Sequence, residues 1–144
     1  MKKLLLGIII LASMGQFASA MTYVCPSIDD IRGHTLLPQQ WHLLNGNSDD
    51  EIKRDVDPAS YDYFMQHVTH FSGASWYEDI PFNAQCYYDG PGIPGEFTLA
   101  LSQDIHTTAP TPNAHWIQGY GRIDCDGTLE QCAFIEVTVH QNSG

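Results

Sequence analysis

Three acidic side chains near the C-terminus are the clearest candidates for metal chemistry. Asp124 and Asp126 are two positions apart, Gly127 permits a sharp turn, and Glu130 follows. Calcium loops use carboxylate oxygens in this way, although this segment lacks the further ligand positions of an EF-hand loop. The alternative is an Asp-Gly hairpin turn whose acids face solvent. We therefore weigh a calcium site at Asp124, Asp126 and Glu130 against a plain turn, and the sequence indicates no other cofactor.

Aromatic side chains are the second group that could act on a ligand. The chain has three tryptophans and seven tyrosines, which is many for a small domain. Aromatic rings stack on sugar rings and anchor protein interfaces, but they also fill cores. We expect most of them to be core residues and a subset to remain exposed. The binding residues that we single out are Trp41, Trp76, Tyr88 and Trp116.

The motifs of common catalytic sites find little support. Ser75 does not lie in a G-x-S-x-G nucleophile motif. The glycine-rich segment 90–95 contains too much proline to cradle a phosphate with backbone N–H groups. His67 and His70 lack the third ligand that catalytic zinc needs. Carboxylate pairs for hydrolysis are possible in many combinations. The sequence thus favours a non-enzymatic binding module, and the alternative is a small secreted hydrolase that uses a carboxylate pair or a bound cation.

The four cysteines are all potential disulfide partners. An even number of cysteines in a short exported chain predicts two disulfides, with three possible pairings. We favour Cys25–Cys86 together with Cys125–Cys132, because the second pair brackets an Asp-Gly turn and its sulfurs could meet across a hairpin. The alternative is a zinc site, but no C-x-x-C spacing is present.

The first twenty residues have the features of a signal peptide. Two lysines precede an apolar run at 4–12, and Ala18-Ser19-Ala20 is a small-residue cleavage site. The run is too short for a transmembrane helix, which needs about 20 apolar residues. Cleavage after Ala20 would leave a single domain, 21–144, in the periplasm or secreted.

The chain is strongly acidic. Its formal net charge is −11, from six basic and 17 acidic residues. Cleavage after Ala20 would remove two lysines and no acid, which leaves −13. Nucleic acids and anionic membranes are poor partners for such a surface, because both are bound through clustered lysine and arginine. The expected partner is a protein or glycan outside the cytoplasm, and the oligomeric state stays open.

The elements that must position these residues are mainly short strands. Turns rich in Gly, Pro, Asn and Asp separate the segments, and long amphipathic helices are missing, which is typical of an antiparallel β-sandwich or barrel. A helical turn is expected near 25–31, residues 61–68 are ambiguous between helix and strand, and 107–113 is expected to be a loop. The expected strands are 41–44, 69–77, 83–88, 96–102, 116–123 and 133–140.

The cysteine and aromatic motifs also carry a family resemblance. They are Cys25-Pro26-Ser27-Ile28, Trp41, Cys86-Tyr87-Tyr88, Trp116, Cys125 and Cys132-Ala133-Phe134. With them the chain resembles a group of short exported proteins of gammaproteobacteria, best represented in Legionella and its relatives, that share a domain of unknown function. The resemblance implies export, disulfides and a role outside the cell, including that of a type II secretion substrate. It supplies no catalytic residue.

Overall fold

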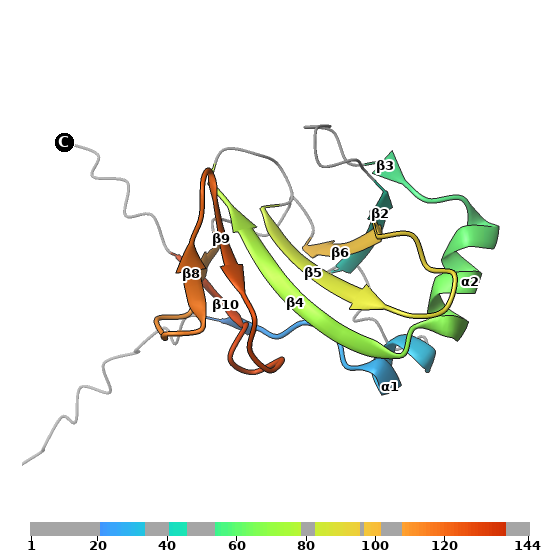
Figure 1. Cartoon of the computed structure of the whole chain (residues 1–144), viewed down its shortest axis with the longest axis horizontal. Helices are drawn as coiled ribbons and strands as arrows, with labels where there is room; N and C mark the ends of the chain where they lie inside the picture. The colour runs from blue at the N-terminus through green and yellow to red at the C-terminus, as the bar shows by residue number, and fades with distance from the viewer. Residues whose placement is uncertain are drawn as a thin grey trace, which may run out of the picture.

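Two antiparallel sheets form most of the molecule. A computed structural model describes residues 21–33, 41–45, 54–78, 83–95, 97–101 and 108–137. Its large sheet has the order β3 (Arg54–Asp55), β2 (Trp41–Asn45), β6 (Phe97–Leu101), β5 (Ala84–Asp89), β4 (His70–Tyr77), β9 (Arg122–Cys125) and β8 (Trp116–Gln118). Its small sheet has the order β1 (Thr22–Tyr23), β10 (Phe134–Glu136) and β7 (Thr108–Pro110) (Figure 1). The predicted mainly-β, sandwich-like fold with two disulfides is confirmed.

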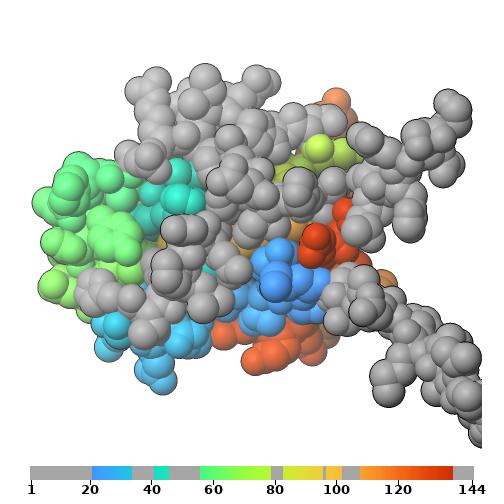
Figure 2. Space-filling view, turned by 180° about the vertical axis from the view of Figure 1, so that it is seen from behind, coloured from blue at the N-terminus to red at the C-terminus, as the bar shows by residue number. Residues whose placement is uncertain are grey.

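One face of the large sheet is the core face. The strand registers place five residues in one row across this face, and none is more than 4% exposed: Leu43, Leu99, Cys86, Ala74 and Cys125. The core cluster continues into the small sheet through Tyr23 and Phe134. Seen from behind, the N-terminal segment lies beside the C-terminal strand, as their pairing requires (Figure 2).

Each disulfide has one cysteine in this row of the core face. Cys86 is bonded to Cys25, and Cys125 is bonded to Cys132. The favoured pairing is therefore confirmed, and the zinc alternative is wrong because no cysteine is free. The expected hairpin geometry is also wrong. Cys125 ends β9 in the large sheet and Cys132 precedes β10 in the small sheet, so their bond joins the two sheets.

Two helices close one end of the large sheet (Figure 1). The expected helical turn is α1 (Ile28–Arg32), which Ser27 caps by accepting a hydrogen bond from the backbone N–H of Asp30. The ambiguous segment lies largely within α2 (Pro58–His67), whose side chains Phe64 and Met65 are buried. Asp57 caps α2, and proline suits its first position because that residue needs no N–H donor. Tertiary burial thus selects the helix.

The remaining differences concern short strands. Part of the expected loop 107–113 is strand β7, which pairs with β10. The expected single strand 116–123 is divided into β8 and β9 by a turn in which Gly121 has a φ of 70°. Within the described ranges, no helix is long and apolar enough to cross a membrane. Residues 138–140 of the expected last strand lie outside the described residues.

Candidate binding site

The second face of the large sheet is more polar than the core face. The registers place a row of six residues across it, from β2 to β8: His42, Ala100, Gln85, Ser75, Asp124 and Ile117. Successive residues of a strand point to opposite faces, so this row is opposite the core row. Ser75 and Gln85 are nevertheless buried. Buried polar groups of this kind require hydrogen-bond partners.

Asp124 is the centre of the hydrogen bonding on this face. Its Oδ1 accepts a hydrogen bond from the Ser75 hydroxyl at 2.5 Å, and its Oδ2 accepts one from Nε of Arg122 at 3.1 Å. The Asp124 side chain is 44% exposed. A carboxylate that is fixed by two donors and still reaches solvent can accept further hydrogen bonds from a ligand.

A tyrosine pair lies next to this carboxylate. The hydroxyls of Tyr77 and Tyr87 are 3.0 Å apart, and the Tyr87 hydroxyl also donates to Oε1 of Gln85 at 3.3 Å. Burial is the largest cause that raises the pKa of Tyr87 above its usual 10.0. Tyr87 is therefore neutral at physiological pH. The two hydrogen bonds of its hydroxyl hold its ring in one position.

A β-bulge lies beside these groups and borders a hollow. The register of β4 against β5 shifts between Phe71 and Gly73, so that Ser72 is the extra residue. Gly73 has a φ of +148°, and a Cβ at this position would lie 2.7 Å from the carbonyl oxygen of Cys125. Only glycine fits this backbone and this close approach.

The hollow has a volume of about 330 Å³. Its polar side chains come from three strands, and its glycines leave the backbone open to a ligand. The described lining residues are Ser72, Gly73, Ala74, Ser75, Tyr87, Tyr88, Asp89, Gly95, Asp124 and Cys125. At its rim, Oδ2 of Asp89 lies 3.3 Å from Nε2 of His70, with both side chains more than half exposed. The hollow thus combines two carboxylates, two serine hydroxyls and two tyrosine side chains.

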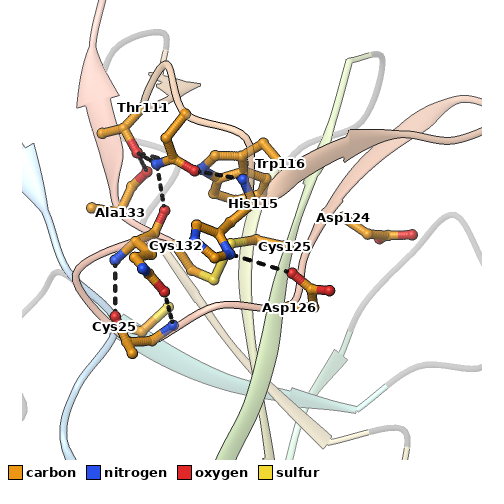
Figure 3. The surroundings of a disulfide bond; sticks show 12 residues. Cys25, Thr111, His115, Trp116, Asp124, Cys125, Asp126, Cys132 and Ala133 are labelled. Atoms are coloured by element: carbon orange, nitrogen blue, oxygen red, sulfur yellow. Dashed lines mark hydrogen bonds and ion pairs between the residues drawn. A yellow bond between two sulfur atoms is a disulfide. The ribbon is translucent and has the colours of Figure 1, made fainter.

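The predicted calcium ligands are not brought together. Asp124 points away from Asp126, which forms an ion pair with Nδ1 of His115 at 3.7 Å (Figure 3). Glu130 lies elsewhere, at a second cavity beside Cys25 and Trp41. In the part of the chain that the structure describes, no three His, Cys, Asp or Glu side chains form a group that could hold a metal ion.

The four predicted aromatic residues have structural contacts. Trp41 and Tyr88 are buried, and the Tyr88 hydroxyl donates to the carbonyl oxygen of Pro26 at 2.6 Å. Trp76 and Trp116 are half-buried, and the indole N–H of Trp76 donates to the Thr108 carbonyl at 3.0 Å. The indole N–H of Trp116 donates to Oγ1 of Thr111 at 3.3 Å (Figure 3). The Trp116 ring also packs on Phe134. Of the four, Tyr88 alone lines the hollow.

Sequence reasoning missed most of the residues that form the hollow. Ser75, Tyr87 and Asp89 drew no functional prediction, and Asp124 was chosen for a different chemistry. The available signal was Gly73 inside a β-rich segment, which is typical of a bulge or a close backbone approach. Tyr120, which is fully exposed on the turn between β8 and β9, was also not singled out.

Comparison with family models, curated proteins and solved structures gave no match.

Proposed function

We propose that this protein is an exported, acidic binding module that uses the hollow beside Gly73 to bind a partner outside the cytoplasm. The observation that carries the proposal is the set of hydrogen bonds that fixes Asp124 between Ser75 and Arg122 at an open hollow. The two disulfides support it, because they attach β5 and β9, two strands of the site, to the rest of the fold. A preorganised site loses less entropy on binding.

Export is the second part of the proposal. The features of residues 1–20 and the two disulfides both fit a protein of an oxidising compartment, because cytosolic thiols are usually kept reduced. The resemblance to short exported proteins, and with it type II secretion, stays a prediction. Fractionation distinguishes the periplasm from the medium.

A matched pair of variants tests the site. Purified, oxidised protein is titrated onto cell-surface preparations, and bound protein is measured. Asp124→Asn removes a charged acceptor in the hollow and should weaken capture at least about tenfold. Asp126→Asn is the control, because it removes an equal charge two residues away and does not line the hollow. Equal losses in both variants would show a charge effect and contradict the proposed site.

A small hydrolase is the second candidate function. Asp89 and Asp124 line the same hollow, and glycoside hydrolysis requires two carboxyl groups on either side of the scissile bond. Incubation of the purified protein with oligosaccharides distinguishes the two functions. Release of product that is lost in both Asp89→Asn and Asp124→Asn would establish the enzyme. Binding without product release would establish the module.

A further inference from the structure

We infer that the hollow beside Gly73 binds a neutral sugar unit, with two adjacent hydroxyls at Asp124 and Ser75 and the C–H face of the ring on Tyr87. The inference rests on the proposed function and specifies its ligand class. It follows from the hydrogen-bonding capacity of the hollow, from its walls and from its charge.

The hydrogen-bonding groups match those of a sugar. Each oxygen of Asp124 accepts one described hydrogen bond, and a carboxylate oxygen has capacity for two. The single hydroxyl hydrogen of Ser75 is directed to Asp124, so Ser75 Oγ can only accept from a ligand. Adjacent acceptors of this kind suit a ligand that presents two neighbouring donors. Two neighbouring hydroxyls of a sugar ring meet that requirement.

The walls of the hollow match a flat ring. Tyr87 lines the hollow and is half-buried, and its hydroxyl is hydrogen-bonded to Tyr77 and Gln85. Its ring is therefore a fixed wall, and the negative face of an aromatic ring attracts the weakly positive C–H groups of a sugar. Gly73 and Gly95 add no side chains to this space. The volume of about 330 Å³ lies at the lower end of the range for small-molecule sites, about 300–1,000 Å³.

The charge of the hollow disfavours acidic ligands. Asp89 and Asp124 line it, and Arg122, which forms an ion pair with Asp124 at 3.1 Å, is not among its described lining residues. Phosphorylated, sulfated or carboxylated sugars would place like charges together, which costs affinity. A protein partner is also a poorer match, because protein interfaces centre on apolar and aromatic anchors. The fully exposed aromatic residue, Tyr120, does not line the hollow.

The first experiment uses the unmodified protein. Purified, oxidised protein is applied to an array of neutral, sialylated and sulfated glycans, with and without periodate treatment, which cleaves neighbouring hydroxyl pairs. We expect binding to neutral glycans that periodate abolishes. Preference for the acidic glycans, or binding that periodate leaves unchanged, would overturn the inference.

Variants then locate the sugar. With the best neutral glycan in calorimetry, we expect Asp124→Asn to bind at least about tenfold more weakly. Tyr87→Leu should bind more weakly than Tyr87→Phe, which keeps the ring, and Asp126→Asn should bind like the wild type. Melting temperatures show whether each variant is folded. Unchanged affinity in a folded Asp124→Asn would place the sugar elsewhere and refute the inference.

The outcomes separate this inference from the proposed function. If no neutral glycan binds, but capture on cell surfaces persists and depends on Asp124, the partner is a protein; the sugar inference then fails and the binding module stands. If neither glycans nor cell surfaces are bound, both proposals fail.

Discussion

At the scale of single residues, Asp124 shows how strand geometry assigns chemistry. Asp124 and Asp126 flank Cys125, and side chains two positions apart share a face only within a strand. Strand β9 ends at Cys125, so Asp126 leaves the sheet and pairs with His115. The side chain of Asp124 instead contacts Ser75, which is 49 positions earlier in the chain. Asp124, which the sequence suggested as a metal ligand, is therefore a hydrogen-bonding group in the hollow.

Buried tyrosines predict a loss of stability at alkaline pH. Burial raises the pKa of Tyr87 and, with the charge of Asp30 as a smaller cause, the pKa of Tyr88 above 10.0. As pH rises through 10, the unfolded chain releases these protons while the folded protein keeps them. The stabilisation is therefore complete below pH 10 and decreases above it. We expect the melting temperature, followed by circular dichroism, to fall steeply between about pH 10 and pH 12.

Substitution of Tyr88 checks this cause. Tyr88→Phe removes the hydrogen bond to Pro26 and should cost about 1 kcal/mol near neutral pH. Its melting temperature should then fall less steeply than that of the wild type above pH 10. Tyr120→Phe is the control, because the Tyr120 side chain is fully exposed. Parallel curves for Tyr88→Phe and the wild type would show that another group causes the alkaline loss.

At the scale of elements, the bulge in β4 requires glycine at position 73. Gly73→Ala places a Cβ 2.7 Å from the backbone carbonyl oxygen of Cys125, on a residue with a positive φ. The close contact and the strained backbone can relax only if β4 or its partner β9 moves. We expect a loss of about 2 kcal/mol or more. Gly95→Ala is the matched control, because nothing lies within 4 Å of its added Cβ. Urea unfolding of both variants measures the difference in stability. Equal stability would contradict the requirement for glycine at position 73.

The two disulfides should contribute unequally. In the chain-entropy model the loop closed by Cys25–Cys86, with a sequence separation of 61, is worth roughly 4 kcal/mol. The loop closed by Cys125–Cys132, with a separation of 7, is worth roughly 2.5 kcal/mol. Double alanine variants, unfolded in urea, test this order. A larger loss without Cys125–Cys132 would show that joining the two sheets matters more than loop length.

At the scale of the whole molecule, the net charge limits the choice of ligand. The formal charge of −11 favours solubility and repels anionic partners over the entire surface. The hollow carries the same sign through Asp89 and Asp124. This field repels anionic ligands, so a neutral ligand that is selected by hydrogen bonding fits the hollow better than an acidic one.

The proposed export predicts the covalent form of the mature protein. We expect the protein recovered from the periplasm or medium to begin at Met21 and to have lost four hydrogens through its two disulfides. N-terminal sequencing and intact mass under non-reducing conditions measure both. A chain that starts at Met1, or one with reactive thiols, would contradict export by cleavage.

The sequence by itself determined the local features of this protein. Period-two hydrophobicity predicted the core strands, as in β6, where Phe97, Leu99 and Leu101 are buried. Cysteine number and spacing predicted the disulfides, and turn residues placed most strand ends. Strand periodicity and turn residues depend on a few neighbouring positions, so one chain is enough to recognise them. The segment of α2 was ambiguous because its tyrosines and phenylalanine also suit a strand.

Only the tertiary structure decided how these pieces meet. Register brings Gln85, Ser75 and Asp124 into one row from three separate strands, and no local pattern encodes that pairing. The same pairing put Cys125 and Cys132 in different sheets and divided 116–123 into two strands. The physical reason is that strand pairing is chosen by burial of the core face over the whole sheet. The polar hollow on the opposite face follows from that choice.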